Sequence, residues 1–238
     1  NWEYRLTDDK GNIKELGGES YNLSYSFRTD VEPTPQLPPV PKNPWEQVWF
    51  KALIGFEKPF SSKGLYQLVI HYADPRHDND IYVYVPGLRR TTRLGAANKC
   101  DCLGGFVYNM DDSNMWSGDT YDFNWKVLGA KELLVDALIT DDEVDKIQSG
   151  GSYIEGAHTL LPKLERRRVW VIEQIPKDPS YCYSKRMFYQ DPQSWWFLRV
   201  EMFDRSGELW KAMTQQYYPF PNPEATGGGK VINCISGS

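Results

Sequence analysis

Residues 166–213 read RRRVWVIEQIPKDPSYCYSKRMFYQDPQSWWFLRVEMFDRSGELWKAM, and this stretch decides the expected fold class. Its runs rich in aromatic and β-branched residues are separated by PKDPS (176–180), QDPQS (190–194) and DRSGE (204–208). Aromatic and β-branched runs favour strands, and Asp, Pro, Ser and Gly favour the turns between them. Strands joined by such short turns pair with their neighbours, so the stretch predicts an antiparallel meander.

The same pattern occurs further toward the N-terminus. In TYDFNWKV (120–127) aromatic residues alternate with Thr, Asp, Asn and Lys, which is typical of an antiparallel strand with one buried face. Three other segments have a similar composition: YNLSYSF (21–27), GLYQLVIHY (64–72) and DIYVYVP (80–86). Most of the chain is therefore expected to be β-strand.

Two segments depart from this pattern of strands and turns. Residues 31–44 contain six prolines and are expected to form an extended connector inside the domain. From the plausible cap Asn43, apolar residues recur at helical spacing and predict a helix that ends near Pro59. The apolar positions are Trp45, Val48, Trp49, Ala52, Leu53 and Phe56. A second helix is predicted within 130–151, which ends in two glycines.

These elements predict an α+β fold that is mostly antiparallel β. We expect one large curved sheet, an incomplete barrel, with one or two helices packed on its concave face. The 238 residues are expected to form a single domain, 1–238, that is truncated at both ends, because the chain begins at Asn1 and strand patterns run up to both termini.

Charge and hydrophobicity exclude several classes of protein. A net charge of −5 makes a nucleic-acid partner improbable, because such proteins present a basic surface to phosphate. No apolar run reaches the roughly 20 residues of a membrane helix. The nine Trp and fifteen Tyr residues must instead fill a core or line a contact surface.

Catalytic and metal-binding patterns are weak. HYADPRHDND (71–80) contains two His and three Asp residues, but a tight turn between two strands explains this composition better than a metal site. No nucleophile motif or zinc spacing occurs. We therefore predict no enzyme activity, no metal and no cofactor.

The four cysteines are Cys100, Cys102, Cys182 and Cys234. A bridge between Cys182 and Cys234 is weakly favoured, and buried free thiols are the alternative. The most local basic cluster is PGLRRTTRLG (86–95), with Arg89, Arg90 and Arg93. These arginines are candidates for contact with an anionic head group or a partner, and a solvated strand face is the alternative.

Three blocks of sequence, in order, resemble a known family: LVIHYADPRHDNDIYVYVPGLRRTTRL (68–94), YDFNWKVLGAKELL (121–134) and residues 167–211 of the opening stretch. The family is a Gram-negative one of unknown function, commonly described as outer-membrane lipoprotein-sorting proteins. The resemblance implies a fold similar to the periplasmic Lol lipoprotein carriers LolA and LolB, in which a curved sheet closed by helices surrounds an apolar cavity.

The resemblance also implies a location and partners. Members are often encoded beside transporters of the resistance-nodulation-division (RND) type and outer-membrane β-barrel proteins. This implies a protein that is free in the periplasm or associated with the outer membrane and that carries a hydrophobic molecule or lipid between the two membranes. It supplies no catalytic residue.

An acyl chain needs apolar surroundings, and the aromatic residues could provide them. The residues expected to line the cavity are Trp45, Trp49, Phe56, Tyr121, Phe123, Trp125, Trp170 and Trp196. A fully packed core is the alternative for each ring. At the level of function, the alternative is a docking subunit of an envelope export complex, or an envelope-stress sensor, without a bound small ligand.

Overall fold

The computed structural model describes residues 2–7, 10, 12–24, 47–74, 76–95, 100–102, 109–136, 164–221 and 230–237. The strands of these residues form two antiparallel sheets of six strands each. The chain divides into two compact units, Asn1–Met110 and Asp111–Ser238, and each unit contains one sheet.

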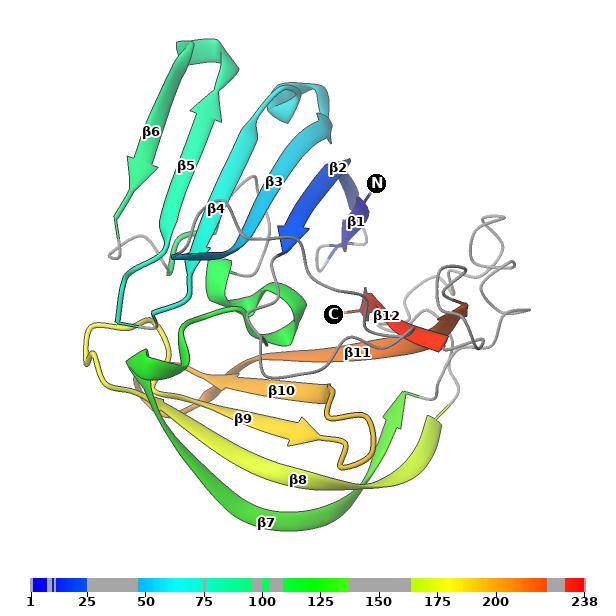
Figure 1. The fold of residues 1–238 in the computed structure, drawn as a ribbon. Coiled ribbons are helices and arrows are strands. Elements are labelled where there is room, and N and C mark those ends of the chain that lie inside the picture. The colour runs from blue at the N-terminus through cyan, green and yellow to red at the C-terminus, as the bar shows by residue number, and fades with distance from the viewer. Residues whose placement is uncertain are drawn as a thin grey trace, which may run out of the picture. The chain divides into compact units, whose positions relative to one another are not determined.

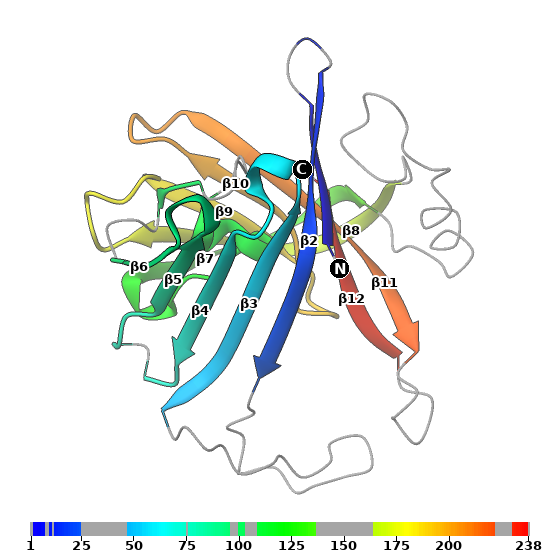
Figure 2. The same cartoon turned by 90° about the horizontal axis from the view of Figure 1, so that it is seen from above.

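The sheet of the N-terminal unit is a meander in which strand order follows chain order (Figures 1 and 2). Its strands are β1 (Trp2–Thr7), β2 (Ile13–Ser24), β3 (Val48–Lys58), β4 (Tyr66–Tyr72), β5 (Asp80–Val85) and β6 (Arg90–Leu94). Short 3-10 turns, η1 (Phe60–Ser62) and η2 (Pro86–Leu88), connect β3 to β4 and β5 to β6. Short loops of this kind explain why neighbours in sequence are neighbours in the sheet.

Alternation along these strands separates a buried face from an accessible one. Ala52, Val69 and Ile81 occupy successive strands, pair across them and are at least 90 % buried. Phe50, Leu94 and Met110 pack against them. The residues between these buried positions point to the opposite face, since side chains alternate along a strand.

The sheet of the C-terminal unit is also a meander, in the order β12-β11-β10-β9-β8-β7. Its strands are β7 (Phe123–Asp136), β8 (Leu164–Pro176), β9 (Lys185–Gln190), β10 (Phe197–Phe203), β11 (Leu209–Pro221) and β12 (Lys230–Gly237). The 3-10 segments η4 (Met110–Met115) and η5 (Thr120–Asp122) precede β7. The prediction of an antiparallel meander from residues 166–213 is confirmed.

Side chains from three neighbouring strands and from η4 build the core of this unit. Phe188, Val200 and Met202 are fully buried, and Met115 and Tyr183 are 1 % exposed. Phe188 pairs with Val200 in the β9–β10 register, so both point to the same face. Apolar residues at every second position thus meet on one side of the sheet.

The predicted helix after Asn43 is wrong, because Val48–Lys58 is the strand β3. Val48, Ala52 and Phe56 are indeed all buried. A spacing of four places residues on one face of a helix and also on one face of a strand, so periodicity alone could not separate the two. Pairing with β2 and β4 on both sides selects the strand.

The second predicted helix is also contradicted over the part that the structure describes. Residues 130–136 belong to β7 and pair with 164–170 of β8. Residues 137–151 and the proline-rich segment 31–44 lie outside the described residues.

The α+β class and the single curved sheet roofed by helices are therefore wrong. The described residues are nearly all antiparallel β, in two separate sheets, and their only helical turns are short 3-10 segments. The backbone hydrogen bonds that the predicted helices would make within themselves are made between strands instead.

Candidate binding groove and buried polar network

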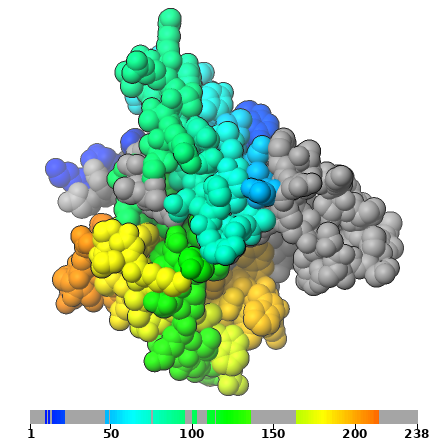
Figure 3. Space-filling model, turned by 60° about the vertical axis from the view of Figure 1, so that its left-hand side comes forward, coloured from blue at the N-terminus to red at the C-terminus, as the bar shows by residue number. Residues whose placement is uncertain are grey.

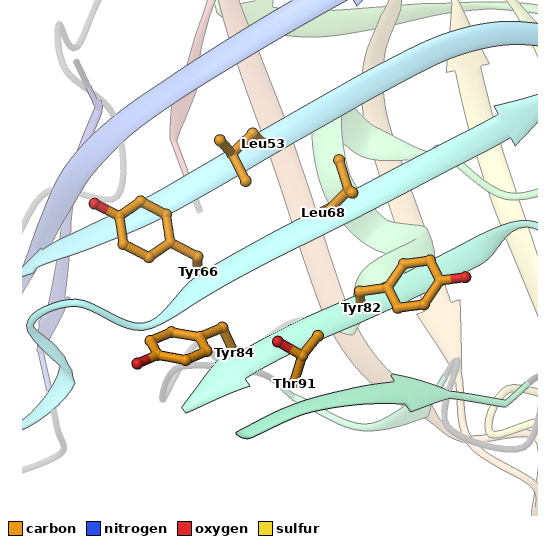
Figure 4. A pocket seen from close by; sticks show the side chains of 6 residues that line it. All are labelled: Leu53, Tyr66, Leu68, Tyr82, Tyr84 and Thr91. Atoms are coloured by element: carbon orange, nitrogen blue, oxygen red, sulfur yellow. The ribbon is translucent and has the colours of Figure 1, made fainter. Parts of the chain in front are cut away.

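An apolar groove lies on the accessible face of the N-terminal sheet. It has a volume of about 350 Å³ and is lined by Leu53, Tyr66, Leu68, Tyr82, Tyr84 and Thr91 (Figure 4). These residues come from the four consecutive strands β3 to β6.

Strand register explains why these side chains meet. Leu53 pairs with Leu68 and Leu68 with Tyr82, which makes one row across the strands. Tyr66 pairs with Tyr84 and Tyr84 with Thr91, which makes a second row. Residues two apart share a face, so the two rows lie side by side and form one continuous apolar strip.

A glycine sets the position of one groove wall. Gly55 pairs with Tyr66, and a Cβ atom added at Gly55 would lie 2.7 Å from Cε1 of the Tyr66 ring. The ring therefore lies over the backbone of Gly55, where only glycine leaves room for it. Figure 4 shows the hydroxyls of Tyr66 and Tyr84 directed toward the same end of the groove and that of Tyr82 toward the other end.

A charged cluster lies next to the Tyr82 end of the same face. Asp80 is two residues before Tyr82, and Arg93 pairs with Tyr82 across the strands. Asp80 accepts a hydrogen bond of 2.7 Å from the Tyr72 hydroxyl and forms a salt bridge with Arg93. Burial raises the pKa of Asp80, but the hydrogen bonds from Tyr72 and Arg93 outweigh it, so the pKa is lowered and the carboxylate stays ionised.

The three candidate arginines do not form one surface. Arg93 is engaged with Asp80, whereas Arg90 begins β6 and points to the opposite face, since the two positions differ by an odd number. Arg89 lies in the preceding turn with a left-handed backbone, φ 48°. The end of this β5–β6 hairpin stands clear at the surface at the top of Figure 3.

The predicted cavity residues are scattered over both units. Trp45 lies outside the described residues, and Trp49 lies in β3 but its side chain is not described. Phe56 is buried in the N-terminal unit with 1 % exposure. Tyr121 is exposed in η5 and packs against Lys177, whose Nζ lies 4.1 Å from the ring centroid.

Phe123 and Trp125 do meet, but in a packed aromatic cluster. The Trp125 ring centroid lies 4.9 Å from that of Trp116 and 5.7 Å from that of Phe188. Phe123 packs edge-on against Trp116 at 6.1 Å. These contacts are at the separations of ordinary aromatic packing: Phe123 is buried, and Trp125 is partly buried against the core.

Trp170 and Trp196 lie elsewhere on the C-terminal unit. Both are partly exposed, Trp170 on β8 and Trp196 in the β9–β10 loop, and neither lines the groove.

The groove tyrosines were not predicted from the sequence. Their signal was the alternation of Tyr82 and Tyr84 with Ile81 and Val83 in DIYVYVP, which places two tyrosines on one face and two aliphatic residues on the other.

A second group, also missed, is a buried polar network centred on Arg186. This side chain is 1 % exposed and donates to Asp112, to the Gln174 side chain and to the Tyr181 hydroxyl, each at 2.8 Å. The Tyr183 hydroxyl donates to the other oxygen of Asp112 at 2.6 Å. The network joins η4 to β8 and β9, so it fixes the turn on the sheet.

Burial and the charged partners together set the ionisation of the network. Burial raises the pKa of both Tyr181 and Tyr183, so these hydroxyls stay protonated and can donate to Asp111 and Asp112. It lowers the pKa of Arg186, but Tyr181 and Asp112 raise it by more, so the guanidinium keeps its charge. Arg186 and Tyr183 therefore both bond the fully buried Asp112 carboxylate, which gives this group a structural role.

The cysteines are divided between oxidised and reduced states. Cys100 and Cys182 are disulfide-bonded, and Cys102 is an exposed free thiol. The Cys234 side chain, the expected partner of Cys182, lies outside the described residues.

In the segment 71–80, the two histidines pack against aromatic rings and Asp74 is bonded to Arg76. His71 packs against Phe50 with ring centroids 5.3 Å apart, and His77 packs against Tyr72 at 4.0 Å. Asp74 accepts two hydrogen bonds from the Arg76 guanidinium. Within the described ranges, no three His, Cys, Asp or Glu side chains are grouped so that they could hold a metal ion.

Helical segments in the described part of the chain lack the length and hydrophobicity needed to cross a bilayer. This finding concerns helices alone.

The chain belongs to the family described as Protein of unknown function (DUF1329), whose model matches residues 8–235. The match spans both units and confirms the family resemblance expected from the three sequence blocks. Over 151 residues the chain is 28 % identical to an uncharacterized protein of Pseudomonas aeruginosa. The aligned part covers 58 % of this chain but 32 % of that relative, so the chain spans about a third of its length.

Two solved structures share the fold. One is a domain from Vibrio parahaemolyticus, provisionally named as an outer membrane lipoprotein-sorting protein, with a TM-score of 0.59 and 17 % identity. The similarity covers 98 % of this chain and 75 % of that one. The other is a DUF1329 family protein from Desulfovibrio piger, with a TM-score of 0.56 and 15 % identity over 89 % of this chain and 66 % of that one. At 17 % and 15 % sequence identity, the similarity to these two structures shows a shared fold.

Proposed function

We propose that this chain is a non-enzymatic carrier in the periplasm that binds a hydrophobic ligand, such as a lipid or the acyl chains of a lipoprotein, during transport between the inner and outer membranes. The observation that carries the proposal is the apolar groove of about 350 Å³ on the N-terminal sheet. Its volume falls at the lower end of the range of small-molecule sites. The name of the Vibrio parahaemolyticus domain supports the same ligand class.

The groove chemistry suits a hydrocarbon chain. Leu53 and Leu68 form its floor, and the tyrosine rings flank them with their hydroxyls at the ends (Figure 4). Each fully buried methylene contributes about 0.8 kcal/mol. A chain in an open groove buries about half of its surface, so ten methylenes contribute about 4 kcal/mol, which corresponds to millimolar affinity. We therefore expect weak binding by the groove alone and tighter binding when a further element covers it.

The partners follow from the same proposal. A carrier of this kind receives its ligand from an inner-membrane transporter, for which the RND type is proposed, and passes it to an outer-membrane β-barrel protein. The open groove supports such transfer, because a ligand exposed on one side can leave without unfolding of the protein.

Titration with decanoate and with monomeric dodecylphosphocholine, followed by NMR, tests the proposal. Resonances of Tyr66, Tyr82 and Tyr84 should shift in a saturable manner. Leu68→Glu should abolish these shifts, because it places a charge on the floor of the groove. The matched control Leu88→Glu changes a leucine that is 70 % exposed in η2, outside the groove, and should bind as the wild type does. Equal binding by both variants, or no saturable shift in the wild type, would contradict the proposal.

A further inference from the structure

The β9–β10 loop holds a tryptophan in an unfavourable backbone conformation at the surface. Trp195 has φ 63° and is 70 % exposed. A bulky side chain at positive φ is strained, and glycine would occupy this position without strain. Exposing the ring to water is also unfavourable. The fold therefore gains nothing from an indole here.

Hydrogen bonds fix this loop rigidly. Asp191, 2 % exposed, accepts from the Ser194 hydroxyl at 2.7 Å, from the Ser194 backbone at 3.1 Å and from Arg167 at 3.1 Å. The Trp195 amide donates to the Asp191 carbonyl, and the Asp191 amide donates to the Trp196 carbonyl, both at 2.9 Å. Backbone strain that so many contacts maintain is found mainly at functional sites.

Two further exposed tryptophans are linked to Trp195, Trp196 as its chain neighbour and Trp170 through Gln190. Trp170 pairs with Gln190 across β8 and β9, and the Gln190 side chain donates to the Trp195 carbonyl at 2.9 Å. Trp170 is 39 % exposed and Trp196 is 38 % exposed. We call Trp170, Trp195 and Trp196 the indole patch.

Charges of both signs lie on the same face of the β7–β8 ribbon as Trp170. Arg166 and Arg168 alternate with Trp170 along β8, so all three point the same way. Glu132 pairs with Arg168 and forms an exposed ion pair with Arg166 at 3.4 Å. Leu134, 64 % exposed, pairs with Arg166 and adds apolar surface.

We propose that the indole patch docks this protein on a zwitterionic phospholipid surface. Tryptophan is the side chain most suited to the boundary between head groups and acyl chains, because its ring is apolar and its N–H is polar. Arg166 and Arg168 match the phosphate of such a head group, and Glu132 matches its ammonium. A net charge of −5 disfavours a uniformly anionic surface. The proposal concerns the C-terminal unit alone and does not depend on what the groove binds.

Co-sedimentation of the full chain with phosphatidylcholine vesicles tests the proposal. The wild type should sediment with the vesicles, and its tryptophan emission should shift to the blue. Trp195→Gly should lower the partition coefficient about tenfold, because it removes the indole. Its melting temperature should be unchanged or higher, since glycine relieves the strained backbone. Loss of binding is then not a consequence of unfolding.

Leu209→Ser is the matched control, because Leu209 is 55 % exposed and pairs with Phe203 at the opposite end of β10. It should bind vesicles as the wild type does. The proposal is overturned by a wild type that does not sediment with vesicles, by Trp195→Gly binding at wild-type strength, or by binding that requires anionic phosphatidylglycerol. If the indole patch bound another protein and the chain did not bind vesicles, the membrane proposal would be overturned, and the patch would be a site for a protein partner.

Discussion

Arg186 is the residue on which the polar interior of the C-terminal unit depends. Its guanidinium is the partner of Asp112, a carboxylate with no solvent exposure. A buried pair contributes little net stability compared with apolar residues of similar volume, but breaking it leaves a charge without compensation.

Arg186→Met should therefore destabilise the protein strongly. We expect the free energy of unfolding in urea to fall by about 3–5 kcal/mol, because Asp112 becomes a buried charge without its partner. Arg205→Met is the control, since Arg205 is exposed and makes one hydrogen bond to a backbone carbonyl. A loss of less than about 1 kcal/mol in both variants would show that Asp112 is not buried as described.

Asp191 should make stability depend on pH. Burial raises its pKa, but hydrogen bonds from Ser194 and Gln193 and the charge of Arg167 outweigh this, so the pKa is lowered from its ordinary value of 3.8. The stabilisation is therefore present above pH 3.8 and is lost as pH falls through the lowered pKa.

Asp191→Asn should lower the melting temperature at pH 7 and flatten its dependence on pH below 4, as measured by thermal unfolding across that range. Glu208→Gln, on an exposed turn, is the control and should leave the curve unchanged. Other carboxylates with lowered pKa, Asp74, Asp80, Asp178 and Asp204, contribute to the same acid dependence, so the curve should flatten in part only.

At the scale of the element, the groove depends on a contact between two strands. Gly55→Ala should displace the Tyr66 ring, because the new Cβ would lie 2.7 Å from Cε1. We expect altered Tyr66 ring resonances, weaker decanoate binding and a loss of about 1–3 kcal/mol from overpacking. Gly95→Ala adds a Cβ that meets nothing within 4 Å and is the matched control. An unmoved Tyr66 ring in Gly55→Ala would contradict the described packing.

The strand β8 has hydrogen-bonded neighbours on both of its edges over only part of its length. It pairs with β7 over 164–176, but with β9 only over 170–174. Amides that face β9 within 164–169 should therefore exchange with solvent faster than those within 170–174, because native protection follows the hydrogen bonds that are present. Hydrogen–deuterium exchange resolved by residue measures this difference, and uniform protection along β8 would contradict it.

At the scale of the whole molecule, the oxidation state of the cysteines offers a direct check. Alkylation of the native protein should modify Cys102, whereas Cys100 and Cys182 should become reactive only after reduction. Reduction should also lower the free energy of unfolding by about 2–4 kcal/mol. Mass spectrometry of peptides with and without reductant locates each modification. Modification of Cys100 or Cys182 without reductant would contradict the described disulfide state.

The sequence by itself determined the family, the turns and the strands of the C-terminal meander from residue 166 onward. From residue 166 to residue 213, alternation and turn chemistry are local properties, so β8 to β11 could be predicted from pattern alone. The blocks that carry the family resemblance lie in these same segments. Helix and strand could not be separated at Val48, Ala52 and Phe56, because a spacing of four satisfies both geometries.

Tertiary structure alone decided where the surfaces lie. Leu53, Tyr66, Tyr82 and Thr91 become neighbours only through the register of four strands, and no local pattern specifies that register. The burial of Arg186 and Phe123, the partial burial of Trp125 and the exposure of Trp195 were likewise decided by packing. The reason is physical: a ring or a charge has the same intrinsic preference at every position, and long-range contacts determine whether protein or water surrounds it.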